Sequence, residues 1–277
     1  AKVAELTKNQ VFLQFKDLHL AIAPIPAIEF KDVSVETAKL PALNAARLSV
    51  SPMFAKFLTA SWGVDSSLEG FLGGNLDLSI KDAGTSENKV PLINADIDFE
   101  ELSLESLAQF TTKPLPVSGK VNLIVDFKFD PKFREQPDGE FELESGPVTF
   151  AASNIPTPFG ELPFPQIQFS NIQLKGRLVG SELIFERALI GGPKDPLSAN
   201  VKGKFALKLI QRAGKVLPVF GKYEVRSELK VAQGSDRTLK LFLNFLDKYK
   251  SSAQKTDIYR FKAAGPRFGP PPQLSAY

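Results

Sequence analysis

The chain has 277 residues, with 34 basic and 31 acidic side chains, a formal net charge of +3 and a hydrophobic content of 43%. Basic and acidic residues are interleaved, so the chain lacks the electrostatic footprint of a nucleic-acid-binding protein. The absence of cysteine excludes disulfides and thiolate metal sites. The 23 phenylalanines, against 4 tyrosines and 1 tryptophan, favour a dry interior or a surface for apolar ligands over a sugar-binding platform.

The first part of the chain predicts short strands. Residues 10–22 place apolar side chains at alternate positions, and the phase slips once, as it does at a bulge. His19 is the only histidine, so it has no partner for a zinc site, and we expect a structural or solvent-facing position. The longest apolar run, residues 20–28, is interrupted by prolines and too short to span a membrane. Because the sequence begins at Ala1, we expect that a signal or anchor segment precedes it.

Three segments predict short helices. Residues 51–58 begin with Ser51 as a plausible N-cap and Pro52 at the first helical position. Residues 102–110 form a short amphipathic pattern. Residues 235–249 place apolar side chains at spacings of three and four, although their alternation also permits a strand.

Glycines and acids in the middle of the chain raise the question of a chemical site. The glycines of residues 68–74 are followed by no Lys-Ser/Thr pair, so they predict turns and bulges rather than a phosphate loop. Alternating acids follow in residues 94–101, and paired carboxylates serve glycosidases and calcium sites. The residues between them are apolar, so we expect the acids on the solvent side of a strand. Acid-only chemistry stays open for four carboxylates: Asp96, Asp98, Glu100 and Glu101.

Two meanders supply the candidate ligand-binding rows. Residues 118–150 contain two alternating strands around an Asp-Gly turn, and residues 166–209 contain three or four short strands joined by tight turns. An ordinary closed core is the alternative for both apolar rows. The candidate residues are Val121, Leu123, Val125, Phe127 and Phe129 in the first meander, and Val201, Phe205, Leu207 and Leu209 in the second.

These patterns predict a mainly β protein. We expect an extended, twisted antiparallel sheet, curled into a groove or packed as a sandwich, with about three short helices. Residues 152–165 contain four prolines and predict an extended connector. It would divide an N-terminal β-rich region, residues 1–151, from a C-terminal meander, residues 166–277, that carries a helix at 236–249 and a proline-rich tail. One continuous elongated domain is the alternative.

Several features occur in an order that resembles a known family. They are the N-terminal strands, residues 48–52 before a short helix, the glycine-rich residues 68–74, residues 172–205 with their glycines, and residues 259–265 before the proline tail. In this order they resemble the type II secretion system protein N family of the long, non-enterobacterial kind. The resemblance implies a non-enzymatic subunit in the periplasm of a Gram-negative bacterium, without cofactors. It would be bound to the inner membrane by an N-terminal anchor and would contact other secretion-system or envelope proteins.

The strand–glycine–strand pattern is also similar to AsmA-type envelope proteins, in which a twisted sheet forms an apolar groove. That resemblance implies binding or transfer of phospholipid. The leading hypothesis is therefore a secretion-system subunit, and the second is a lipid-handling groove protein. An enzyme comes third, because the sequence shows no nucleophile–base pair, metal cluster or cofactor loop.

Overall fold

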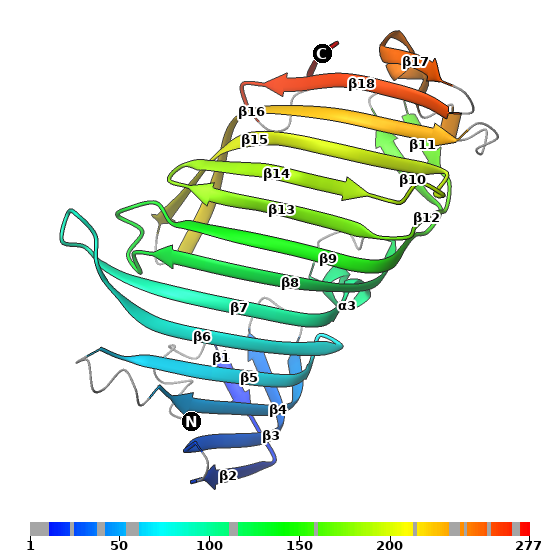
Figure 1. Cartoon of the computed structure of the whole chain (residues 1–277). Coiled ribbons are helices and arrows are strands. Elements are labelled where there is room, and N and C mark those ends of the chain that lie inside the picture. The colour runs from blue at the N-terminus through cyan, green and yellow to red at the C-terminus, as the bar shows by residue number, and fades with distance from the viewer. Residues whose placement is uncertain are drawn as a thin grey trace. The chain divides into compact units, whose positions relative to one another are not determined.

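The computed structural model describes residues 11–22, 25–37, 42–53, 61–110, 116–157, 160–212, 215–232, 239–240, 243–253, 256–267 and 272–277. The protein is mainly β, as Figure 1 shows, which confirms the predicted class. The strands of the described residues form a seventeen-stranded sheet and a two-stranded one. All described pairings are antiparallel. The chain divides into two compact units. The first comprises Ala1–Leu115 and Lys120–Pro131, and the second comprises Pro116–Gly119 and Lys132–Tyr277.

In the first unit, consecutive strands from β3 to β8 pair with one another. β2 and β1 pair with the first and second halves of β3, and Asp32, with a φ of 50°, separates the two halves. The strands are β1 (Val11–Gln14), β2 (Asp17–Ala21), β3 (Ala27–Thr37), β4 (Leu43–Pro52), β5 (Gly63–Phe71), β6 (Gly74–Thr85), β7 (Pro91–Ser103) and β8 (Val117–Phe129), whose first residues belong to the second unit.

In the second unit, β9 pairs with β12 and β13, and the order continues through β14, β15 and β16 to β18. β17 and β19 pair with the two ends of β18. Residues 152–165, the predicted connector, lie inside this unit and contain the β10–β11 hairpin. The strands are β9 (Asp138–Phe150), β10 (Ser153–Thr157), β11 (Gly160–Phe164), β12 (Ile167–Phe169), β13 (Ile172–Val179), β14 (Glu182–Ile190), β15 (Leu197–Arg212), β16 (Lys215–Ala232), β17 (Lys250–Ala253), β18 (Thr256–Gly265) and β19 (Gln273–Ser275).

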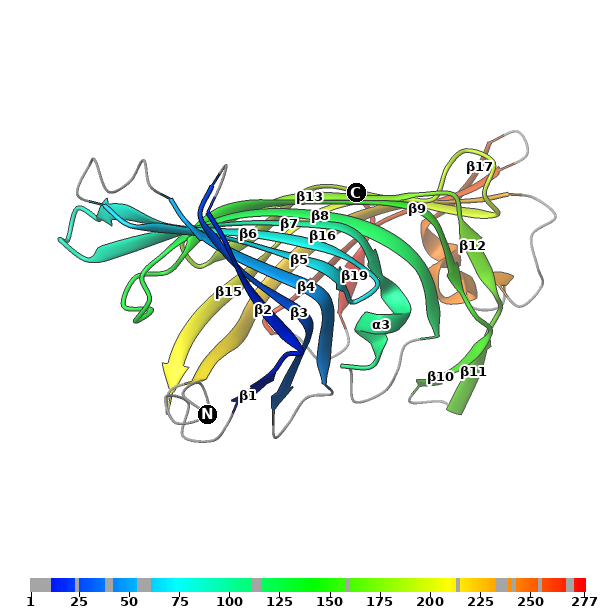
Figure 2. The same cartoon turned by 90° about the horizontal axis from the view of Figure 1, so that it is seen from below.

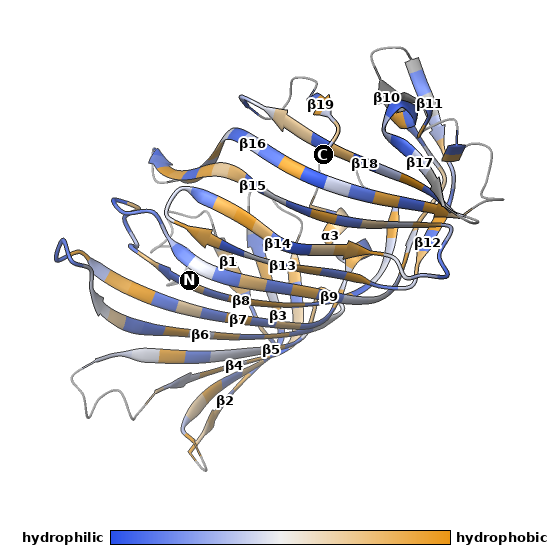
Figure 3. Ribbon diagram, turned by 45° about the horizontal axis from the view of Figure 1, so that its top comes forward, coloured by the Kyte–Doolittle hydropathy of each residue, from blue (hydrophilic) through white to orange (hydrophobic). Residues whose placement is uncertain are grey.

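Each unit's sheet has one apolar and one polar face. Successive side chains of a strand point to opposite sides, so the period of two in the sequence separates the two kinds of residue. Figure 3 shows this alternation as orange and blue segments along the strands. The register then aligns like with like: Val125 lies opposite Ile97 in the first unit, and Leu178 lies opposite Leu183 in the second.

The described residues contain one complete α-helix, α3 (Leu104–Ala108), rather than the expected three or so. It confirms the helix predicted within residues 102–110. The Ser103 hydroxyl caps it by accepting a hydrogen bond from the Ser106 N–H at 3.1 Å, and Glu105 lies in the first turn, where a negative charge is favourable. No helix within the described residues is both long and apolar enough to cross a membrane.

Of the other two helix predictions, the one at residues 51–58 is wrong where the structure describes it, and the one at residues 235–249 is supported. Ser51 and Pro52 end β4, paired with β5, so they do not begin a helix, and residues 54–58 lie outside the described residues. Between residues 235 and 249, Leu239, Lys240 and Leu243 are helical and a 3-10 helix, η1, follows at Asn244–Tyr249. Here the described residues support the helical alternative over the strand.

A buried apolar cluster lies in the second unit, where this helical segment packs against one end of the apolar face. The buried apolar residues of the first unit have smaller side chains, and three of them are alanines. The second-unit cluster consists of Ile167, Phe169, Val231, Leu239, Leu243, Leu246 and Tyr259. The first-unit residues are Val33, Ala45, Ala95, Leu102, Ala108, Val121 and Val125.

Candidate functional site

The first candidate row lies on the apolar face of the first unit. Val121 and Val125 are buried, with exposures of 3% and 9%, but the other three members are only half-buried. The row continues across β7, where Ile97 lies opposite Val125. The face is therefore closed around the valines and partly open around the larger side chains. The complete row on β8 is Val121, Leu123, Val125, Phe127 and Phe129.

The second candidate row lies on the apolar face of the second unit, along β15. Its four members, Val201, Phe205, Leu207 and Leu209, are all half-buried. The register with β16 shifts between Phe205 and Leu207 because β16 contains an extra residue there. The bulge leaves the alternation of β15 unbroken, so the structure brings all four residues to one face, as the sequence predicted.

A row of aromatic rings crosses this face of the second unit. It runs from Phe141 on β9 through Phe185 on β14 and Phe205 on β15 to Tyr223 on β16. Successive ring centroids are 5.9, 5.4 and 5.7 Å apart. The ring centroids of Phe141 and Tyr223, at the two ends of the row, are therefore at most about 17 Å apart. All four rings are half-buried, so each presents part of its surface to solvent.

Two glycines make room for the ends of this row. A Cβ at Gly176 would lie 2.5 Å from Cζ of Phe141, and a Cβ at Gly265 would lie 2.7 Å from Cε1 of Tyr223. Contacts this short do not occur between real side chains, so any larger residue would displace the rings. Gly176 lies within β13 and Gly265 ends β18, so both glycines serve ring packing.

Sequence reasoning missed three members of the aromatic row: Phe141, Phe185 and Tyr223. Their contact depends on the register of four strand pairs, and the register includes a bulge in β14. The available signal was an aromatic residue at an apolar-face position in each of four strands.

The helical segment at residues 239–249 covers one end of the same face. Leu239 and Leu246 are each 2% exposed, and Val231 beneath them is 1% exposed. Burial there also raises the pKa of the Tyr259 phenol. The apolar face is thus sealed at this end and half-open along the aromatic row.

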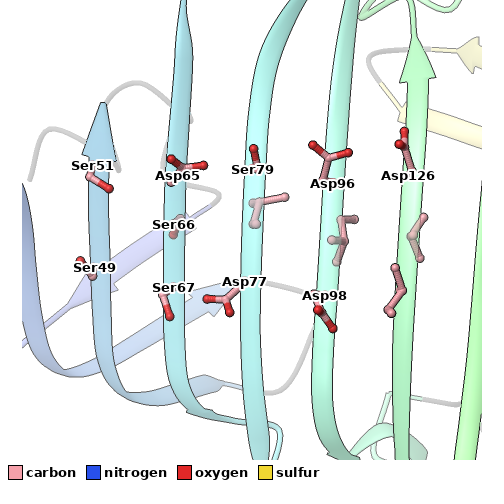
Figure 4. Close-up of a pocket in the computed structure, with 14 residues that line it drawn as sticks. Ser49, Ser51, Asp65, Ser66, Ser67, Asp77, Ser79, Asp96, Asp98 and Asp126 are labelled. Atoms are coloured by element: carbon pink, nitrogen blue, oxygen red, sulfur yellow. The ribbon is translucent and has the colours of Figure 1, made fainter. Parts of the chain in front are cut away.

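The polar face of the first unit carries a hollow of about 510 Å³ between two rows of short polar side chains (Figure 4). The pairing explains the rows, since Asp96 lies opposite Ser79 on one side and Asp126 on the other. One row is Ser51, Asp65, Ser79, Asp96 and Asp126; the other contains Ser49, Ser67, Asp77 and Asp98.

The four candidate carboxylates do not converge on one point. Asp96 is half-buried and accepts hydrogen bonds from Lys81 Nζ (2.6 Å) and Asn94 Nδ2 (2.8 Å). The bond to Asp96 raises the pKa of Lys81, so it stabilises the charged pair. Glu101 lies in a bulge and pairs with Lys120 at 2.7 Å.

The two remaining carboxylates, Asp98 and Glu100, are exposed on the polar side of β7, which confirms the predicted solvent face for this strand. His19 is also exposed, on β2. No group of acidic or histidine side chains within the described residues is arranged to hold a metal ion.

The chain matches no protein-family model, no characterised protein and no solved structure. Its function must therefore be argued from the geometry of its own faces.

Proposed function

We propose that the protein binds lipid acyl chains along the apolar faces of its two units. The observation that carries this proposal is the partial exposure of both apolar rows, which an ordinary closed core would bury. Large exposed apolar surface on a folded protein marks a site for an apolar ligand, a partner or a membrane.

The residue types favour an aliphatic ligand over a protein partner. Protein interfaces are enriched in Trp, Tyr and Arg, whereas these rows consist of Phe, Leu and Val, with one Tyr. The rings at the two ends of the aromatic row have centroids at most about 17 Å apart. This length is comparable to one leaflet of a bilayer whose core is about 30 Å thick. It would therefore accommodate one extended acyl chain lying across the strands.

Bound lipid is the direct test. The chain would be purified from a bacterial envelope and analysed by native mass spectrometry with lipid extraction. We expect co-purifying phospholipid that is lost in Phe205→Asp and Phe127→Asp, because each places a charge on an apolar face.

The matched controls are Asn200→Asp and Lys128→Asp, at exposed positions on the polar side of the same two strands. They should retain lipid. Circular dichroism would verify that all four variants are folded, and displacement of a fluorescent fatty acid gives a second readout. The proposal would be contradicted if the protein carried no phospholipid. It would also be contradicted if the Phe variants retained as much phospholipid as the controls.

The secretion-system subunit of the sequence analysis is the second candidate function. One observation favours protein contacts: within the described residues β2 pairs only with β3, and it exposes Leu18 (47%) and Leu20 (70%). An exposed apolar edge strand is a site where another chain adds a strand. Cross-linking at Leu20 in envelope extracts tests this, and capture of lipid alone would count against it.

A further inference from the structure

The end of the β15–β16 hairpin differs from the rest of these two strands. We define the hairpin end as residues 206–212 of β15 and 215–223 of β16. On one side Leu207 pairs with Phe220, and on the other Ile210 pairs with Leu217. Nearer the core of the unit, the second side carries charged pairs such as Lys204 and Glu224. The hairpin end thus carries apolar residues on both sides, with basic residues among them on the second side, whereas the rest of the sheet is apolar on one side.

This hairpin end projects beyond its neighbouring strands. β14 pairs with β15 only up to Ala206, and β18 pairs with β16 only from Tyr223 onward. Figure 2 shows the yellow ends of β15 and β16 bending away from the other strands of the unit. Four large apolar residues are exposed there: Val216 (41%), Leu217 (42%), Val219 (47%) and Phe220 (46%).

The base of the hairpin end is held in place by a side chain. Gln136 Nε2 donates to the Leu209 carbonyl at 3.0 Å, and the Leu209 N–H donates to Gln136 Oε1 at 2.8 Å. The Leu207 N–H also donates to the Ser181 carbonyl at 2.9 Å. These bonds fix the direction of the projection.

The charge of the hairpin end has one sign. Its sequence contains four basic residues, Lys208, Arg212, Lys215 and Lys222, and no acidic residue. Elsewhere on these strands three basic side chains have acidic partners: Lys204 with Glu182 at 3.0 Å, Arg226 with Glu224 at 3.6 Å and Lys230 with Glu228 at 3.1 Å. Within the described residues, neither Lys208 nor Arg212 forms an ion pair.

We propose that the hairpin end docks on an anionic lipid bilayer. Its exposed apolar side chains would enter the boundary between headgroups and acyl chains, and its basic residues would contact the anionic headgroups. Insertion is shallow, because unpaired strand edges carry backbone groups that the hydrocarbon core cannot satisfy. Leu207 and Leu209 belong both to the hairpin end and to the second apolar row. The exposed apolar residues of β16 and the basic residues lie outside that row, so the docking proposal does not depend on bound acyl chains.

Vesicle co-sedimentation tests the docking. Vesicles of phosphatidylcholine with 30% phosphatidylserine would be compared with pure phosphatidylcholine, at low and high salt. We expect binding to the anionic vesicles that weakens with salt. Each basic residue near such a surface contributes about a fivefold gain in affinity, so Lys208→Glu with Arg212→Glu should reduce binding at least about twentyfold. Lys202→Glu, at an exposed position on the polar side of β15, is the charge-matched control and should change binding far less.

Depth of insertion distinguishes docking from simple charge attraction. In a Trp62→Phe background, which removes the only tryptophan, Phe220→Trp should be quenched by brominated lipid and shift to the blue on binding. Leu217→Glu with Phe220→Glu should abolish binding, whereas Leu20→Glu, an equally drastic change in the first unit, should not.

Vesicle binding that survives Leu217→Glu with Phe220→Glu would overturn the proposal, as would failure to bind anionic vesicles at all. The outcome is independent of bound acyl chains: protein that carries no extracted lipid but docks on vesicles would refute the proposed function and leave this inference standing.

Discussion

The two units place different residues on the polar faces of similar sheets. In the second unit, opposite charges meet across strands: Arg260 and Glu228 are 2.7 Å apart, and Lys262 and Glu224 are 2.8 Å apart. In the first unit, like charges meet at the hollow, where Asp98 lies opposite Asp77. Outside the hollow this unit also has a cross-strand pair of opposite charges, Arg47 and Glu69, at 3.3 Å. Period-two alternation decides which face is polar, but it leaves the choice of polar residue free. In the second unit, Glu224 and Glu228 provide cross-strand attraction even though Arg226 lies opposite both Lys202 and Lys262. The directly opposed aspartates of the first-unit hollow lack such attraction.

The two units also differ in how large and how deeply buried their core side chains are. The second unit seals one end of its apolar face with leucines that are 2–3% exposed, whereas the first unit buries mainly alanine and valine. We therefore expect the second unit to be the more stable of the two.

The largest effect should come from opening the sealed end. Leu246→Ala removes a fully buried side chain, so the free energy of unfolding of the second unit should fall by about 2–5 kcal/mol. Leu123→Ala, at a half-buried position in the first unit, should cost less than about 2 kcal/mol, because less surface returns to water. Urea denaturation followed by hydrogen exchange, read separately over the two units, measures both. Equal losses of unfolding free energy in the two variants would contradict the expectation that the second unit has the more stable core.

Acid should weaken the second unit through its glutamates. The hydrogen bond from Arg260 lowers the pKa of Glu228, and that from Lys262 lowers the pKa of Glu224. A lowered pKa adds stability above the unfolded-state value of about 4.3, and that stability is lost as the pH falls through the folded-state value.

The variant Glu228→Gln isolates this contribution. It should cost about 1 kcal/mol or less at pH 7, in line with partly exposed pairs. It should also flatten the decline of stability in urea melts between pH 5 and about pH 2, the interval in which such carboxylates titrate. An unchanged pH slope would show that these pairs do not stabilise the sheet.

The smallest effect should come from giving the first unit the charge pattern of the second. Asp77→Lys would place a cation opposite Asp98, and a cross-strand pair of opposite charges contributes about 0.2–1 kcal/mol. Thermal unfolding should show a small gain that shrinks at high salt. A loss of stability would contradict the prediction, because it would show that Asp77 stabilises the first unit despite lying opposite another aspartate.

Alternation made much of this fold predictable from sequence. The rows on β8 and β15 obey a strict period of two, so their members and their common face could be read directly. Helices were harder to predict, because short segments bounded by proline and serine satisfy both helix caps and strand ends. Ser51 and Pro52 illustrate this: a plausible cap in the sequence, they are the last paired residues of β4.

The aromatic row and the hairpin end could not be derived in the same way. Phe141 and Tyr223 belong to one row only because four strand pairings bring them to one face, and no local pattern specifies such a register. The two-sided apolar character of residues 216–220 is visible in the sequence. Its meaning depends on where β14 and β18 end, which is a property of the assembled sheet.

The clamp at Gln136 has a consequence for self-association. A strand that extends past its neighbour exposes a row of backbone donors and acceptors, which can template the addition of a foreign strand and lead to aggregation. The Gln136 amide is hydrogen-bonded to both the N–H and the carbonyl of Leu209. These two backbone groups are therefore not available to pair with an incoming strand. Within the described part of the chain, this edge has no neighbouring strand beyond Ala206, and a single side chain protects it. The apolar residues farther along the hairpin remain exposed.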